Sequence, residues 1–137
     1  MINKLLIILV ISFNFLFINK LYSTELQFNA NEIEVLDEGN ETIAKNGSAY
    51  IKKDKISIKG SIIRYIKNKS LLIIKEGEVK KIDDNLKITS GVIEYSVNQS
   101  NLYFRDDVKI NDNINNINIA TDEINYNVEK QKIESLG

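Results

Sequence analysis

The chain has 137 residues, a formal charge of −1, and no histidine, cysteine or proline. This length suits a single domain, and the absence of a dominant basic charge argues against nucleic acid as a partner. Without histidine or cysteine the chain lacks the commonest catalytic base, the thiol nucleophile and the usual zinc ligands. We therefore expect no enzymatic activity, no catalytic residues, no metal site and no cofactor, and we interpret carboxylate pairs such as Asp83 and Asp84 as solvated turn residues.

The N-terminal segment has the pattern of an export signal. Lys4 precedes an apolar run from Leu5 to Ile18, and Lys20 follows it. This run fits the central region of a secretory signal and is short for a membrane span. We expect residues 1–23 to be a signal peptide or an uncleaved anchor, and residues 24–137 to form one domain outside the cytoplasm.

A unit of about thirty residues then recurs four times. The copies begin at Leu26, Ile56, Leu86 and Ile117, in steps of 30, 30 and 31 residues. Each copy has an apolar-x-apolar pair, a small residue two positions later, and then an apolar-x-apolar pair that is mostly Ile-x-Tyr. A fixed period of this size indicates supersecondary units that stack on one another.

Each unit has the pattern of strands and turns. In the second copy β-branched residues alternate from Ile56 to Ile66, which predicts a strand with one buried face. A polar turn at 67–70 and a second apolar run at 71–82 follow, and Glu76-Gly77 marks a turn or bulge within that run. No segment after residue 24 shows a sustained helical period, so we expect an all-β fold.

The two apolar pairs of a unit are out of phase. Ile56 and Ile58 have even numbers, whereas Ile63 and Tyr65 have odd numbers, and side chains alternate faces along a strand. Both pairs can point inward only if a bulge or corner near the small residue Gly60 shifts the phase; otherwise one pair is exposed. With the shift, the inward residues form an apolar trough suited to acyl chains: Leu26, Phe28, Ile33, Ile56, Ile58, Ile63, Leu86, Ile88, Ile93, Ile117, Ile119 and Ile124.

These repeats resemble a known family. The strings "FNANEIEV", "ISIKGSIIRY", "ITSGVIEY" and "IATDEINY" are similar to the A-D-x-I-x-Y repeat of the OstA-like family, although the second copy has Gly60-Ser61 where the family often has Ala-Asp. This family comprises the lipopolysaccharide-transport proteins LptA and LptC and the N-terminal periplasmic domain of LptD, which we take as the nearest member. The resemblance covers Leu26 to Gly137.

The resemblance implies both a fold and a function. The expected fold is a twisted, V-shaped β-jelly roll that shelters the acyl chains of lipopolysaccharide, and the expected location is the periplasm or the cell outer membrane. Such modules dock with homologous OstA-like modules (LptA, LptC, LptD) through strand edges, which the unpaired terminal strands of a sheet would allow.

Two questions stay open at the level of sequence. The first is whether the chain is instead an exported structural β-solenoid with a filled core and no lipid. The second concerns length: strand residues follow Gly47 and Gly77, whereas nothing follows Gly137 at the matching place. We expect the domain to be incomplete at its C-terminus and the chain to be the start of a longer LptD, with a small complete LptA as the competing interpretation.

Overall fold

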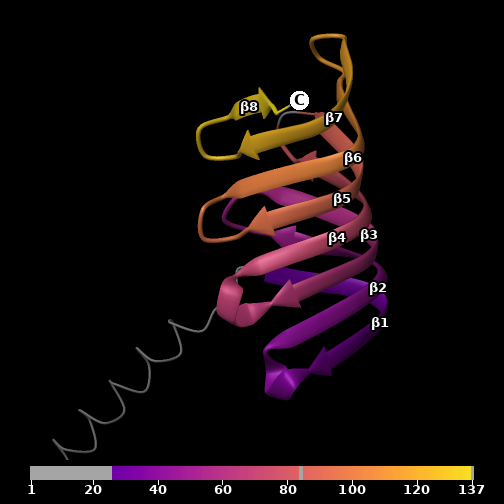
Figure 1. Ribbon diagram of the computed structural model, residues 1–137, viewed down its shortest axis with the longest axis vertical. Coiled ribbons are helices and arrows are strands. Elements are labelled where there is room, and N and C mark those ends of the chain that lie inside the picture. Colours follow the sequence, from indigo (N-terminus) through magenta and orange to yellow (C-terminus); the bar gives the residue numbers. More distant parts are fainter. Residues whose placement is uncertain (1–25, 84, 137) are drawn as a thin grey trace, which may run out of the picture.

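The computed structural model describes residues 26–83 and 85–136, which form one eight-stranded antiparallel sheet with its strands in chain order (Figure 1). The predicted signal segment, residues 1–23, lies outside this part. Among the described residues the helical segments are two 3-10 turns, Asp37–Gly39 and Lys67–Lys69, and no helix is long and apolar enough to cross a membrane. The strands are β1 (Leu26–Leu36), β2 (Glu41–Ile51), β3 (Ile56–Ile66), β4 (Leu71–Lys81), β5 (Leu86–Ser96), β6 (Asn101–Asp112), β7 (Ile117–Asn127) and β8 (Lys132–Ser135).

Short turns fix the register of these strands. The last residue of several turns has a positive φ, as at Lys55 (51°), Ser70 (47°) and Ser100 (50°). This left-handed residue closes a tight hairpin and leads directly into the next strand. The sheet is therefore a meander in which each repeat contributes two neighbouring strands.

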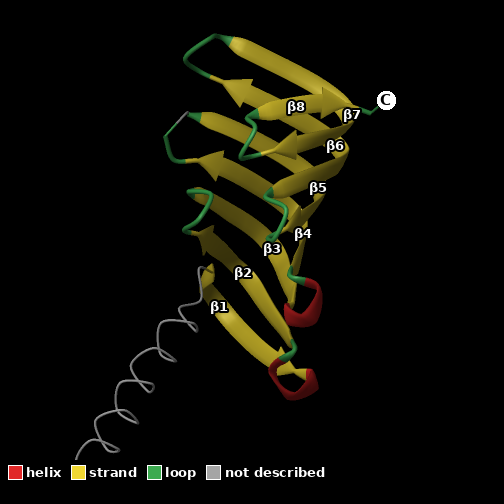
Figure 2. Cartoon of the chain, turned by 90° about the vertical axis from the view of Figure 1, so that its left-hand side faces the viewer, coloured by secondary structure: helices red, strands yellow, loops and turns green. Residues whose placement is uncertain are grey.

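The sheet is folded over on itself, so that each long strand runs through two limbs (Figure 2). Figure 2 looks into the open side between the limbs, and the strands bend on the far side. The first limb holds residues 26–30, 47–51, 56–60, 77–81, 86–90, 108–112 and 117–121. The second limb holds residues 32–36, 41–45, 62–66, 71–75, 92–96, 101–105, 123–127 and 132–135.

Small residues form the crease where the limbs meet. Ala30 pairs with Gly47, Gly47 with Gly60, and Gly77 with Ser90 across neighbouring strands. On either side of Gly60, both Ile58 and Ile63 are 0% exposed. The predicted phase shift is thus confirmed, and both apolar pairs of β3 point into the interior.

The even-numbered strands turn the crease through left-handed residues. Asn46 in β2 and Glu76 in β4 both have a φ of 48°, and each precedes a glycine. A Cβ atom on Gly47 would lie 2.4 Å from the Cβ atom of Ala30 and 2.5 Å from the backbone oxygen of Asn29. The crease is therefore too narrow there for any side chain.

Strand β6 turns at the crease without a glycine. It has 12 residues where the other long strands have 11, and both Asp106 and Asp107 have a positive φ. Its pairing shifts by one residue against β5 and again against β7. This extra residue accounts for the 31-residue step of the third repeat.

We expect Gly47→Ala to lower the free energy of unfolding by about 1–3 kcal/mol. The added methyl group would overlap backbone atoms, and these cannot move aside by a change of rotamer as a side chain can. Chemical denaturation followed by circular dichroism measures this. Ser48→Ala, one residue further along β2, serves as the control and should change stability by less than about 0.5 kcal/mol. Equal stability of the two variants would show that the crease is not crowded.

Candidate functional site

The candidate site is the apolar interior between the two limbs. Directly paired residues of antiparallel strands carry their side chains on the same face, so the register follows an inward position from strand to strand. In the first limb the inward row is Phe28, Ala49, Ile58, Val79, Ile88, Ile110 and Ile119. In the second limb it is Ile33, Ala44, Ile63, Ile74, Ile93, Phe104 and Ile124.

The twelve residues predicted to line the trough fall into three groups by exposure. Six are buried, with at most 1% of their surface exposed: Ile56, Ile58, Ile63, Ile88, Ile93 and Ile124. Three are partly buried and pack against the core: Leu26, Phe28 and Leu86. Three are exposed: Ile33 (49%), Ile117 (43%) and Ile119 (48%).

The middle of the interior is a packed core rather than an open channel. Leu72, Tyr95 and Phe104 are 0% exposed, like the isoleucines of the same level. Towards the N-terminal end the rings of Phe28 and Tyr65 approach across the limbs with centroids 6.2 Å apart. Apolar surface is therefore accessible at the two ends of the stack and closed at its centre.

The exposed residues follow from a stagger between the limbs. Asp54, in the turn at the outer edge of the first limb, hydrogen-bonds Tyr95 and Ser100 of the second limb, 41 and 46 residues further along the chain. At this level the β2–β3 turn of one limb thus faces the β5–β6 turn of the other. Because consecutive strands are neighbours, each limb extends past its partner at one end.

Each of these extensions presents apolar side chains. The N-terminal overhang, formed by Ile33 and Val35 of β1, is 49% and 62% exposed. The C-terminal overhang, formed by Ile117 and Ile119 of β7, lies where β8 no longer covers the strand, since β8 pairs only with residues 124–127. Both overhangs belong to inward faces that no other described residue of the chain covers.

A cavity of 470 Å³ opens between the limb edges near the C-terminal overhang. Leu86 and Ile114 line it from the first limb, and Tyr126 and Ile133 line it from the second. Asp112 adds a carboxylate whose pKa is lowered by hydrogen bonds from the side chain and backbone of Asn115. The interior thus opens to solvent at a mixed apolar and acidic mouth.

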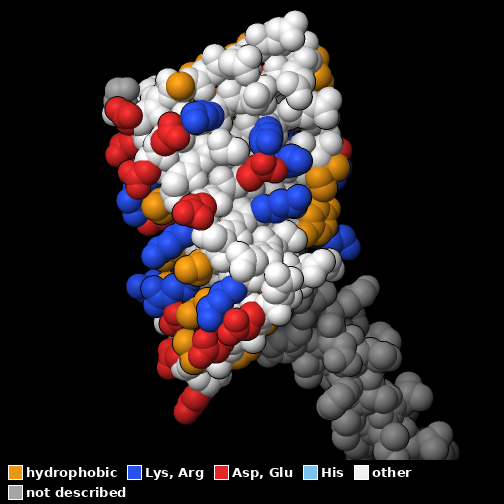
Figure 3. Space-filling view, turned by 90° about the vertical axis from the view of Figure 1, so that its right-hand side faces the viewer, with side chains coloured by type: hydrophobic (Ala, Val, Ile, Leu, Met, Phe, Trp, Pro, Cys, Tyr) orange, Lys and Arg blue, Asp and Glu red, His pale blue; other side chains and the backbone are white. Residues whose placement is uncertain are grey.

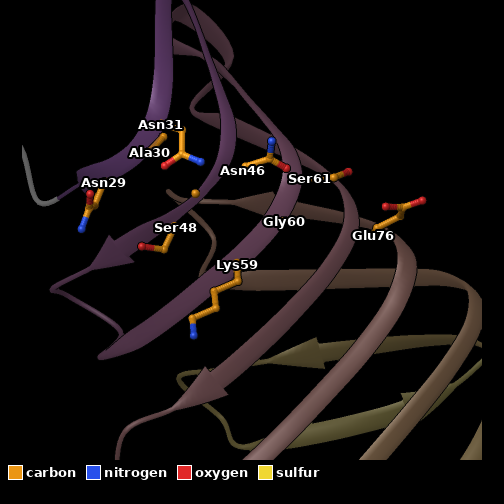
Figure 4. A pocket seen from close by; sticks show the side chains of 10 residues that line it. Asn29, Ala30, Asn31, Asn46, Ser48, Lys59, Gly60, Ser61 and Glu76 are labelled. Atoms are coloured by element: carbon orange, nitrogen blue, oxygen red, sulfur yellow. The ribbon is translucent and has the colours of Figure 1, made fainter.

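A second hollow lies at the crease and is polar (Figure 4). Its volume is 560 Å³, and Asn29, Asn31, Asn46, Lys59 and Glu76 contribute side chains to it. Gly47 and Gly60 also line it. Its lining does not suit an acyl chain.

The outer surface is charged with both signs (Figure 3). In the second limb Arg64 binds Glu41, and the hydrogen bond from Arg64 lowers the pKa of that carboxyl. In the first limb Glu78 lies between Lys80 and Lys87. Such exposed pairs contribute little stability, but they keep the outer face polar opposite the apolar interior.

Among residues 26–83 and 85–136, no group of three or more acidic, histidine or cysteine side chains is arranged to hold a metal ion.

Comparison with known proteins gives a structural match. No family model and no curated protein matches the sequence. The crystal structure of LptH, the LptA-homologous periplasmic component of the lipopolysaccharide transport device from Pseudomonas aeruginosa, superposes with a TM-score of 0.69 at 14% identity, covering 80% of each chain. The chain has the fold of LptH. The predicted V-shaped β-jelly roll of the LptA type is thereby confirmed, whereas the finer assignment to LptD stays a prediction.

Sequence reasoning missed Asp54, the residue that joins the two limbs. Its setting, Lys52-Lys53-Asp54-Lys55, reads as a solvated turn. No signal in the sequence joins Asp54 to Tyr95, because the two residues lie in different repeats, 41 positions apart.

We expect Ile93→Ala to lower the free energy of unfolding by about 2–5 kcal/mol, because it leaves a void in a fully buried row. Ile119→Ala removes the same atoms from a half-exposed end of the interior and should cost less than about 1 kcal/mol in the isolated protein. Urea denaturation of both variants makes the comparison. Similar losses would contradict the assignment of a closed centre and open ends.

Proposed function

We propose that this chain is a non-enzymatic periplasmic module of lipopolysaccharide transport, exported by its N-terminal segment, that shelters acyl chains between its limbs and bridges membranes by docking with homologous modules. The observation that carries the proposal is the LptH fold, combined with an apolar interior left uncovered at both ends of the stack. Lipopolysaccharide and OstA-like modules such as LptA, LptC and LptD are the partners.

The ends of the sheet support the docking part of the proposal. β1 and β8 stand at opposite edges of the sheet, and each has one neighbouring strand. An uncovered strand edge offers backbone hydrogen bonds to an added strand. The two overhangs lie on opposite limbs, so a following module could place its N-terminal overhang against the C-terminal overhang of the preceding one and complete both interiors.

The interior supports the lipid part of the proposal. Rows of Ile, Leu, Phe and Tyr side chains run the length of the stack and reach solvent at the overhangs and the cavity beside Tyr126. Acyl chains bind apolar surface of this kind without directional contacts. Since the centre is packed, lipid uptake requires the limbs to separate.

We expect a photoreactive benzoylphenylalanine at Phe28 or Ile119, both on the inward row, to capture lipopolysaccharide in cells. The same residue at Gln27 or Asn118, each one position away on the outward face, is the matched control and should capture none. Immunoblotting of the purified protein for lipopolysaccharide after irradiation measures the outcome. Absence of lipid from the inward positions would favour the alternative, an exported β-solenoid scaffold with a permanently filled core.

Docking has a separate test. Ile119→Lys places a charge on the C-terminal overhang and should weaken self-association, or binding to an OstA-like module, by at least about tenfold, because the charge would be buried without a partner. Asn118→Lys adds the same charge to the outward face of the same strand and should leave association within about twofold. Analytical ultracentrifugation over a concentration series measures both, and equal association constants would remove the overhang from the interface.

A further inference from the structure

The edges of the two limbs touch at one level of the open side. Asp54, in the turn between β2 and β3, accepts hydrogen bonds from the hydroxyls of Tyr95 and of Ser100, the latter at 2.9 Å. In the same turn the ammonium group of Lys53 donates to the backbone oxygen of Val97 at 2.8 Å. These bonds connect the first limb to the second across the mouth of the interior.

The contact is buried although it lies at the edge of the molecule. Asp54 is 8% exposed, and Tyr95 and Ser100 are 0% exposed. A buried carboxylate is costly unless donors satisfy it, and here both of its oxygens have one. Among the described residues no buried side-chain nitrogen or oxygen lacks a partner. The carboxylate is therefore held by groups of the opposite limb, and separating the limbs would leave all three polar groups to water.

This contact lies one turn away from the cavity between the limb edges. Ile51 and Ile56, which flank the Asp54 turn, are 0% exposed. Thirty residues after Lys53 of the Asp54 turn lies Asp83 of the first limb, and 31 residues after Ser100 lies Gln131 of the second limb; both line the 470 Å³ cavity between the limb edges. The edges thus touch at Asp54, and a cavity lies between them one turn further along the stack.

We propose that Asp54, Tyr95 and Ser100 form a releasable clasp that closes the open side of the interior and must open for an acylated amphiphile to enter. This inference rests on the proposed function. An amphiphile with a bulky polar head inserts its chains sideways, while the head stays in water, so the limb edges must part. Hydrogen bonds to one carboxylate hold the closed state reversibly, since water replaces each of them when the limbs separate.

Removing the clasp should speed uptake. Tyr95→Phe combined with Ser100→Ala deletes both hydroxyl donors and keeps the ring in the core. We expect fluorescently labelled lipopolysaccharide to bind this variant about tenfold faster than the unsubstituted protein in stopped-flow measurements. Ser61→Ala is the control: it removes a serine hydrogen bond to the backbone of Lys75 on a neighbouring strand, 3.1 Å long, and should leave the rate unchanged.

Locking the clasp should have the opposite effect. The chain contains no cysteine, so Asp54→Cys with Ser100→Cys can be bridged selectively with dibromobimane. The bridged protein should take up labelled lipopolysaccharide at least about tenfold more slowly than the same variant before bridging. The matched control is Glu32→Cys with Lys45→Cys, which replaces an exposed ion pair of 3.1 Å between neighbouring strands of the second limb and should bind equally fast before and after bridging.

The rate of lipopolysaccharide uptake should rise in the first variant and fall when the second is bridged. General misfolding would not change the rate in opposite directions. Unchanged uptake after bridging of Asp54→Cys and Ser100→Cys would show that lipid enters through the ends of the stack and would overturn the clasp alone. Failure of the unsubstituted protein to bind lipopolysaccharide would overturn the proposed function, and the clasp with it.

Discussion

The narrow crease between the limbs is the constraint on which the rest of the structure depends. A Cβ atom on Gly60 or Gly77 would lie within 2.5 Å of an isoleucine side chain of the interior, so a larger residue at either position would displace the core. Every long strand turns there and presents inward side chains on both sides of the crease. In all of the long strands except β6 the inward positions before and after the crease have opposite parity. A single sheet therefore encloses its own core, and within residues 26–83 and 85–136 no second sheet and no long helix packs against it.

The stagger of the limbs explains why this core is uneven. At the centre both limbs are present at every level, and Ile58, Ile93 and Phe104 are fully buried. At each end only one limb continues, so identical positions of the repeat become exposed apolar surface. The polar contact at Asp54 joins the limbs in this offset arrangement through hydrogen bonds that water can replace. Packing at the centre and accessibility at the ends are thus two results of one geometry.

The sequence predicts well both the repeat and which positions of each strand point inward, because these depend on local pattern. The boundaries of β3 follow from the alternation between Ile56 and Ile66, and the phase shift follows from Ile58, Gly60 and Ile63. The exposure of side chains at the ends of the stack cannot be predicted in this way, because it depends on whether strands of the opposite limb cover a position. Ile119 and Ile58 carry the same pattern, yet one is half exposed and the other buried. The hydrogen bonds of Asp54 are not predicted by the sequence, because its partners lie in another repeat and in the other limb.

The extra residue of β6 has a consequence for how such a chain can change length. Along an ordinary stretch of strand, one inserted residue exchanges the inner and outer faces of everything that follows. In β6 the inward residues Phe104 and Ile110 are six positions apart, against five for Ile74 and Val79 in β4, and all four point inward. Two consecutive left-handed residues, Asp106 and Asp107, take up the difference. At the bend of the even-numbered strands, one residue can thus be inserted or deleted without exchanging the inward and outward faces of the strands that follow. Differences in repeat length should therefore be found there.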